Sequence, residues 1–92
     1  MNLNNLVFIN NLPSIDLHGY DRESASIAIK EFINDNLKMH NEFIVIIHGN
    51  GTGVLKTTCT HILKQNKNVV DYKIWYNNDG STVVQLKREN FN

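Results

Sequence analysis

Ile15-Asp16-Leu17-His18-Gly19 and His48-Gly49-Asn50-Gly51-Thr52-Gly53 are the stretches that decide the fold of this 92-residue chain. Each closes an apolar, strand-like run with a His-Gly pair, and each is followed by a helix-like pattern. In open α/β sheets, ligands bind just beyond the carboxyl ends of the strands. We therefore expect His18 and His48 to lie on the same edge of one sheet. A glycine-rich loop beside them can direct its backbone N–H groups at an anion near a helix N-terminus.

Working outward, four apolar runs predict strands, over 15–18, 43–47, 69–76 and 82–86. The first run alternates with period two, so that Ile15 and Leu17 face one side and the polar residues face the other. The run 43–47 is continuously apolar and rich in β-branched residues, as expected of a central strand buried on both faces. The last two runs are joined by Asn77-Asn78-Asp79-Gly80, which predicts a hairpin turn.

Two amphipathic patterns predict helices between these strands. The first helix begins after the N-cap Asp21 and ends near Met39, and the second follows the glycine loop and ends at 65–67. The order β-α-β-α-β-β predicts an α/β fold, a two-layer sandwich of a four-stranded mixed sheet and two helices. A short apolar run at 6–9, cut off before Pro13, predicts an edge strand or an arm packed on the domain.

The composition is that of one globular domain without a strong electrostatic field. Formal net charge is +0 and the pI is about 6.9, so a contact with nucleic acid has to come from a local patch. Cys59 is the single cysteine, which predicts a reducing compartment, and no apolar run approaches the roughly 18 residues of a membrane span. We expect a cytoplasmic monomer without membrane contact, organised as an arm over 1–13, a domain over 14–88 and a tail over 89–92.

The glycine loop is a candidate phosphate site. A Walker A loop requires Gly-Lys-Ser/Thr after its spacer, and a dinucleotide fingerprint requires its third glycine one residue later, so both are excluded. Lys56 lies in the first turn of the following helix, where a cation opposes the helix dipole unless it meets an anion. The alternative is a tight turn beside a solvated lysine. The candidate phosphate-binding residues are Gly49, Asn50, Gly51, Thr52, Gly53 and Lys56.

The two histidines at the strand ends are candidate proton-transfer groups. With Asp16 two residues before it on the same face, His18 can act as a general acid or base beside a group that orients it. Each histidine could instead be a strand-end residue bonded to the backbone. Asp16, His18 and His48 could also bind a metal; no cysteine or His-x-x-x-His pair supports structural zinc, which leaves a weakly held Mg²⁺ or Mn²⁺ open.

Other reactive or aromatic residues have simpler interpretations. His40 lies in a loop and His61 lies off the apolar stripe of its helix, so both are expected in solvent, whereas Cys59 lies on the stripe and is expected in the core. Trp75 and Tyr76 are neighbours on a strand, so one should face the helices and the other the free side. The free-side ring could stack a base or pack across strands.

On its two motifs, the chain resembles the small MutS-related (Smr) domain family. The family's hallmarks are Leu-Asp-Leu-His-Gly and a later His-Gly-x-Gly-x-Gly, and the similarity runs from Ile15 to about Lys87. The resemblance implies a two-layer α/β sandwich like the C-terminal domain of translation initiation factor three. It also implies nucleic-acid binding, often with endonuclease activity on DNA or RNA, by a stand-alone member of the family. Asn50 replaces a lysine that is frequent in relatives. The resemblance places the functional positions at Asp16, His18, His48, Gly49 and Gly51.

The leading hypothesis is an endonuclease that cleaves RNA or DNA phosphodiester bonds. The loop amides and Lys56 would bind the phosphate, and His18 and His48 would exchange protons with the attacking and leaving oxygens. Asp16 would orient His18. On RNA the 2′-hydroxyl could attack without a metal, whereas on DNA a water is required and a divalent ion is favoured. The alternatives are a non-catalytic module that docks on RNA or the ribosome, and a protein-interaction domain that uses the free sheet face near Trp75 or Tyr76.

Overall fold

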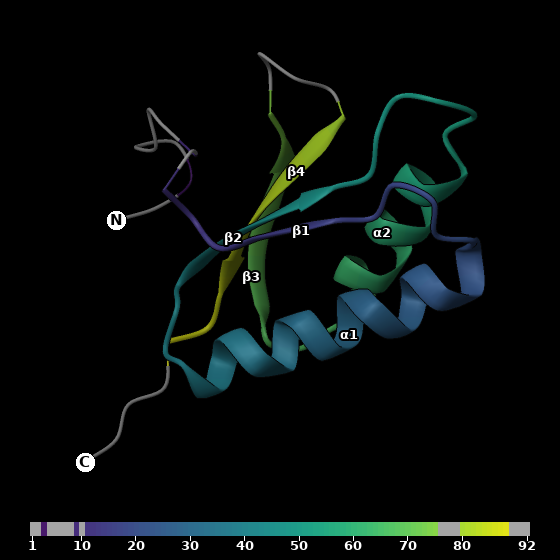
Figure 1. The fold of residues 1–92 in the computed structure, drawn as a ribbon. Coiled ribbons are helices and arrows are strands. Elements are labelled where there is room, and N and C mark those ends of the chain that lie inside the picture. The colour runs from purple at the N-terminus through teal and green to yellow at the C-terminus, as the bar shows by residue number, and fades with distance from the viewer. Residues whose placement is uncertain (1–2, 4–8, 10, 76–79, 89–92) are drawn as a thin grey trace.

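The computed structural model of this chain describes residues 3, 9, 11–75 and 80–88. Six elements follow one another in the predicted order: β1 (Ser14–Asp16), α1 (Arg22–Lys38), β2 (Phe43–Ile47), α2 (Val54–Gln65), β3 (Val69–Ile74) and β4 (Ser81–Leu86). The strands form one mixed sheet and the two helices form a layer against it (Figure 1). The predicted fold class, a two-layer α/β sandwich with four strands and two helices, is confirmed.

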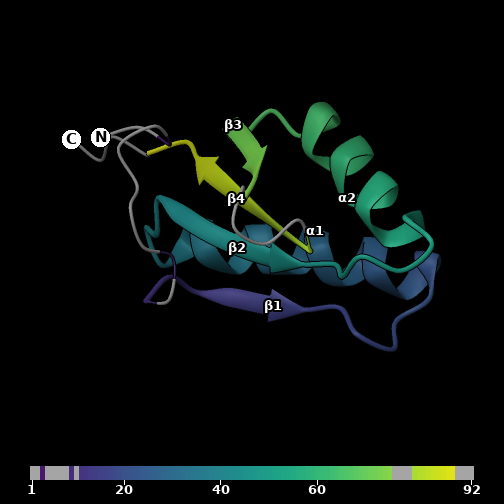
Figure 2. The same ribbon diagram turned by 90° about the horizontal axis from the view of Figure 1, so that it is seen from above.

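The order of strands in the sheet is β1-β2-β4-β3. β1 runs parallel to β2, with Ile15 opposite Ile46, and α1 makes the crossover between them. β4 is antiparallel to both of its neighbours, so the last strand of the chain inserts between β2 and β3. The two parallel strands β1 and β2 therefore lie side by side and end at the same edge of the sheet, where the chain turns toward the helices (Figure 2).

The helix layer covers one face of the sheet and encloses the larger core. Ile29 and Ile33 of α1 and Leu63 of α2 pack against β-strand residues such as Ile44 and are all nearly inaccessible to solvent. Cys59 belongs to this core, as predicted, and burial raises the pKa of its thiol to about 12. The thiol is therefore neutral and serves packing, not nucleophilic chemistry. Within the described part of the chain, neither helix is long and apolar enough to cross a membrane.

The opposite face of the sheet has a smaller apolar cluster. Trp75 faces this side and is buried with Phe43, Val45 and Val83, and the Lys73 ammonium lies 5.8 Å from its ring centroid. Leu3 is 1% exposed in the same cluster, and Ile9 and Leu12 pack against it. The described residues of the segment before β1 thus cover the sheet face that was considered as a site for base stacking or protein interaction.

Four strand boundaries differ from the prediction, the first being the start of β1, which lies one residue earlier, at Ser14. β1 ends two residues earlier, at Asp16, because the Asp16 side chain bonds the backbone just ahead of it. β3 ends at Ile74, and β4 begins one residue earlier than predicted, at Ser81. The parts of the prediction that lie outside the described residues are 1–2, 4–8 and 10 of the arm, which include 6–8 of the first apolar run, Tyr76, 77–79 of the turn and the tail over 89–92.

Candidate functional site

The two His-Gly motifs lie side by side at one edge of the sheet, as predicted. The backbone N–H of Leu17 donates to the carbonyl of Ile47 at 2.8 Å, which extends the β1–β2 pairing by one residue beyond Asp16. Neighbouring strands are about 4.8 Å apart. The chain therefore leaves β1 at His18 and β2 at His48 from adjacent positions, and both loops then run toward the helix layer (Figure 1).

His18 is exposed at the start of a tight turn. The Asp16 carboxylate accepts the backbone N–H of His18 at 2.9 Å, and the N–H of Tyr20 donates to the Leu17 carbonyl at 3.0 Å. Gly19 follows with φ +85°, a conformation that favours glycine. Asp16 thus holds the backbone of His18 and not its imidazole, which differs from the expected carboxylate–imidazole pair. The His18 ring remains accessible to a ligand.

His48 is only 6% exposed, and both of its ring nitrogens have partners. Nδ1 lies 3.1 Å from the Gly49 carbonyl oxygen and Nε2 lies 2.8 Å from the Thr82 hydroxyl. A carbonyl can only accept, so Nδ1 carries the proton and Nε2 accepts from the hydroxyl. Burial lowers the pKa of His48; the Gly49 hydrogen bond opposes this effect and the nearby Lys56 charge adds to it. His48 is therefore a neutral anchor between the glycine loop and β4.

The first glycine of the loop has a structural role. The backbone N–H groups of His48 and Gly49 both donate to the Gly80 carbonyl, at 2.8 and 2.9 Å. Gly49 was expected to offer its N–H to a phosphate, but that group is already bonded, and its φ of +78° requires glycine. Among the described residues, no acceptor pairs with the N–H groups of Asn50, Gly51, Thr52 and Gly53. These four amides remain available to an anion.

The loop runs directly into an uncapped helix. Gly53 is the N-cap of α2 in the left-handed conformation, with φ +85° and no side chain to accept from the first turn. The Thr52 hydroxyl lies 3.4 Å from the Val54 nitrogen, a long contact for a hydrogen bond. The first turn contains no acid and carries Lys56, close enough to His48 to influence its pKa. Unpaired N–H groups, a helix dipole and a lysine together make this loop a candidate anion-binding site.

Arg22 is a candidate that the sequence analysis missed. It is the first residue of α1, and it lines a shallow hollow together with Thr52 and Gly53 of the glycine loop. The signal was present in the sequence, since a cation in the first turn of a helix is unfavourable unless an anion is near. The same argument had been applied to Lys56 alone. The structure thus places a second cation beside the candidate phosphate site.

The residues considered as metal ligands do not form a ligand set. Within residues 3, 9, 11–75 and 80–88, no three His, Cys, Asp or Glu side chains are placed to hold a metal ion. Asp16 and His48 both already bond groups of the chain, and His18 stands alone in solvent. Asp16, His18 and His48 are therefore not gathered into a three-ligand set in this structure.

Comparison with known proteins decides the family. The model of the Smr domain matches residues 15–87, most of the chain and both His-Gly motifs. The chain belongs to the Smr domain family. This Smr domain is 36% identical over 77 residues to Endonuclease MutS2 of Clostridium novyi, covering 80% of this chain and 10% of that protein. It is also 36% identical over 78 residues to Endonuclease MutS2 of Ligilactobacillus salivarius, covering 82% of this chain and 10% of the relative.

Solved structures show the same fold. The Smr domain of Thermus thermophilus MutS2 aligns with a TM-score of 0.80 at 23% identity, over 83% of this chain and 99% of that one. YdaL, a stand-alone small MutS-related protein from Escherichia coli, aligns with a TM-score of 0.78 at 20% identity, over 82% of this chain and 64% of that one. The chain spans about a tenth of the length of the MutS2 relatives.

Proposed function

We propose that this Smr domain binds nucleic acid and cleaves its phosphodiester backbone, with RNA as the substrate that its residues fit best. The observation that carries the proposal is the free start of α2: four unpaired loop amides and Lys56 lie at the same edge of the sheet as an exposed histidine. The name of the MutS2 relatives, endonuclease, supports the same class of reaction. RNA is favoured because its own 2′-hydroxyl can attack, so the protein need not bind a metal to activate water.

In the proposed reaction, the amides of Asn50 to Gly53 and Lys56 bind the scissile phosphate and offset the charge that develops on it. The neutral His18 imidazole accepts the proton of the 2′-hydroxyl as that oxygen attacks phosphorus. The bond from phosphorus to the 5′-oxygen breaks, giving a 2′,3′-cyclic phosphate, and the leaving oxygen takes a proton from the His18 imidazolium. Asp16 holds His18 through its backbone N–H, and His48 positions the glycine loop through the Gly49 carbonyl.

A second function is favoured by one specific observation. Both nitrogens of His48 are bonded within the protein, so His18 is the one imidazole of the two motifs that can exchange a proton with a substrate. His18 alone can serve both proton transfers in turn. A module that only docks on RNA or on the ribosome, however, needs no proton transfer at all. The phosphate site at the start of α2 would be the same in this second function.

Cleavage of end-labelled structured RNA distinguishes the two functions. Wild-type protein, His18→Ala and the control His40→Asn are compared with and without EDTA, on RNA and on the same RNA with 2′-deoxy nucleotides. Asn suits position 40 because its φ is +61°. We expect His18→Ala to lose cleavage by about 10²- to 10⁴-fold while still binding RNA, and the 2′-deoxy substrate to resist cleavage.

Other outcomes each overturn part of the proposal. Equal cleavage by His18→Ala and wild type would remove His18 from the reaction. If wild type binds RNA but cleaves nothing, the domain is a docking module. Cleavage of the 2′-deoxy substrate that EDTA abolishes would show a metal-dependent attack by water in place of the 2′-hydroxyl. Absence of any salt-dependent RNA binding would leave only the protein-interaction function.

A further inference from the structure

A groove leads away from the phosphate site between the two helices. Next to the glycine loop, a hollow is lined by Arg22, Thr57 and Thr58. These residues also line the next hollow, whose volume of about 720 Å³ lies in the range of ligand sites. Ser26, Lys30, His61 and Ile62 then continue the lining into a third hollow that ends at Asn66.

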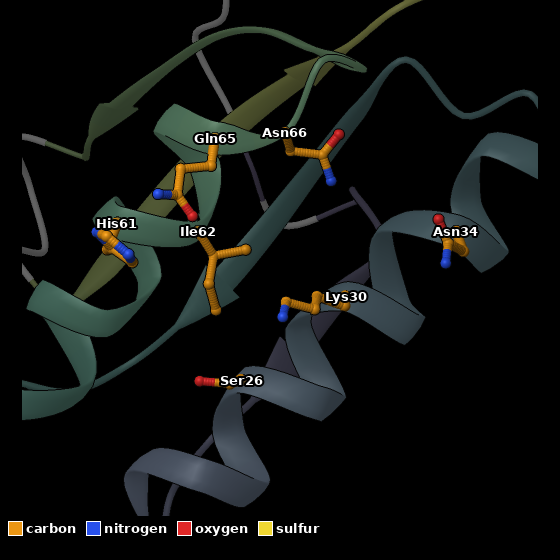
Figure 3. Close-up of a pocket in the computed structure, with 7 residues that line it drawn as sticks. All are labelled: Ser26, Lys30, Asn34, His61, Ile62, Gln65 and Asn66. Carbon is orange, nitrogen blue, oxygen red and sulfur yellow. The ribbon is translucent and has the colours of Figure 1, made fainter.

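Both walls of the groove come from regular positions on their helices. Arg22, Ser26 and Lys30 recur every four residues on α1, and His61 follows Thr57 by the same interval on α2, so each set forms one stripe. In Figure 3, the side chains of Ser26 and Lys30 extend from α1 toward α2. The Ser26 hydroxyl donates to the Arg22 carbonyl at 2.9 Å, which uses its only proton. The groove therefore presents its cations as the principal donors to a ligand.

Charge is segregated toward this groove in a chain that is neutral overall. The chain has nine basic and nine acidic residues, yet α2 carries Lys56, His61 and Lys64 and no acid. Glu23 is the one acid among the lining residues of the described hollows, against the two cations Arg22 and Lys30. A further hollow on the other side of His61 is lined by Lys56 and Lys64. Such a local excess of positive charge attracts a phosphate backbone.

The length of the groove defines what it can hold. Arg22 and Lys30 are eight residues apart on α1, which corresponds to about 12 Å at 1.5 Å per residue. A stacked strand advances about 3.4 Å per nucleotide, so this distance spans three to four phosphates. Packed helices have axes about 8–10 Å apart, and the groove between them fits one strand and not a duplex.

We propose that the α1–α2 groove holds three to four nucleotides of single strand that flank the phosphate bound at the glycine loop. Arg22, Lys30 and His61 bind the backbone of this flanking strand. The inference rests on the proposed nucleic-acid binding, and it assigns to the same site a substrate class, a single-stranded segment adjoining the bound phosphate. It also gives His61, which the sequence analysis placed in solvent without a role, a function in binding.

The test compares oligonucleotides of different length by fluorescence anisotropy. The probes are 2′-O-methyl RNAs of two and eight nucleotides, which resist cleavage because the 2′-oxygen is blocked. The variant Lys30→Gln/His61→Gln is compared with Lys38→Gln/His40→Asn, a matched pair at the far end of α1 outside the groove. We expect the groove variant to bind the octanucleotide at least fivefold more weakly, with a salt slope reduced by about 1, and to bind the dinucleotide as wild type does.

Each outcome separates the groove from the proposed function. If the groove variant binds the octanucleotide as tightly as wild type does, the proposed role of the groove is wrong. If both proteins still bind the dinucleotide, the proposed phosphate site is retained. No binding of either probe by wild type would overturn the proposed function and the groove with it. A second readout needs no variant: in amide NMR of the wild type, the octanucleotide should shift residues along both helix stripes, and the dinucleotide only those of the glycine loop. Equal shifts with both probes would contradict the groove.

Discussion

The two helices of this domain begin in opposite ways. At the start of α1, the Asp21 carboxylate accepts the Ser24 backbone N–H at 2.8 Å, and the Ser24 hydroxyl accepts the Asp21 N–H at 3.2 Å. At the start of α2, Gly53 has no side chain to accept a hydrogen bond, and Lys56 takes the place that an acid usually has. Every helix leaves its first N–H groups without internal partners. At α1 the Asp21 side chain pairs the Ser24 N–H, whereas no side chain caps the start of α2.

This difference separates a structural helix end from a binding one. The hydrogen bond from the Ser24 backbone lowers the pKa of Asp21. The start of α1 therefore stabilises the negatively charged form of its capping carboxylate. α2 offers the same kind of positive end, but the sequence supplies no anion for it. A missing cap generally costs a helix about 0.5–2 kcal/mol, and an external phosphate can supply the missing interaction. The comparison therefore supports the proposed phosphate position without reference to any relative.

The largest effect should follow from giving α2 the negative charge that it lacks. In Gly53→Asp the carboxylate would occupy the position proposed for the phosphate, whereas Gly53→Asn has the same shape without the charge. A Cβ at this position meets nothing within 4 Å, and Asn and Asp are the residues that best tolerate a φ of +85°. We expect Gly53→Asp to bind RNA at least tenfold more weakly than Gly53→Asn in anisotropy titrations.

Equal RNA affinities of the two Gly53 variants would contradict an anion at the start of α2. Thermal unfolding of both proteins provides the control. The backbone cost of a side chain at this position is shared, and an acid at a helix N-terminus is favourable, so Gly53→Asp should be at least as stable as Gly53→Asn. Weaker binding by the more stable variant could then not be attributed to unfolding.

A smaller effect, on stability alone, should follow from removing the cap of α1. Asp21→Ala deletes the carboxylate that accepts the Ser24 backbone N–H and hydroxyl, and it should lower the melting temperature by about 4–8 °C. Because the folded-state pKa of Asp21 lies below 3.8, the contribution of the cap is present above that pH and is lost as the pH falls through the folded-state pKa. RNA affinity at 20 °C should stay within about twofold of wild type.

Asp35→Ala is the matched control for the cap of α1, since it removes an exposed acid of the same helix without touching the first turn. Its melting temperature should stay close to that of wild type. A loss of RNA affinity in Asp21→Ala, beyond any seen in Asp35→Ala, would mean that the capped N–H groups of α1 bind the ligand in addition to the Arg22 side chain, and the contrast between the two helices would fail.

The smallest effect concerns His48, which supports the loop before α2. Its pKa is lowered from 6.5 in the folded protein, so the unfolded chain takes up a proton at a pH where the folded chain does not. The contribution of neutral His48 to stability is therefore full above pH 6.5 and decreases as the pH falls below it. Urea unfolding at pH 7.5, 6.5 and 5.5 should show this decrease in wild type, and His48→Gln should lack it. An identical pH dependence in both proteins would show that His48 is not held neutral.

Local sequence signals predicted the fold closely. The Asp21 cap and the four-residue spacing of apolar positions place α1 to within a residue, and the continuous apolar run over 43–47 coincides with β2. These features depend on neighbours along the chain, which a sequence displays directly. The end of β1 was predicted too late because the Asp16 side chain accepts the His18 N–H, which a longer strand would have used for pairing. The alternation of apolar and polar residues carries no information about such a side-chain hydrogen bond.

The position of the two His-Gly motifs was predicted correctly, but their hydrogen bonds were not. The edge of the sheet follows from two parallel strands ending in His-Gly, which the sequence makes visible. The partners of His48 and Gly49 are Thr82 and Gly80, residues of the last hairpin that reach the loop only after β4 has inserted beside β2. The groove likewise depends on how α1 packs on α2. No local sequence pattern could therefore predict that Lys30 lines a groove that starts at the glycine loop.

The most direct test of the central claim is an amide NMR titration with the non-cleavable 2′-O-methyl dinucleotide. One experiment reports on both helix starts at once. The account predicts that the amides of Asn50 to Lys56 shift on addition of the dinucleotide and that those of Glu23 to Ala25, held by the capping box of α1, do not. Shifts of equal size at both helix starts, or none at Asn50 to Lys56 while other residues respond, would contradict a phosphate site built from the uncapped start of α2.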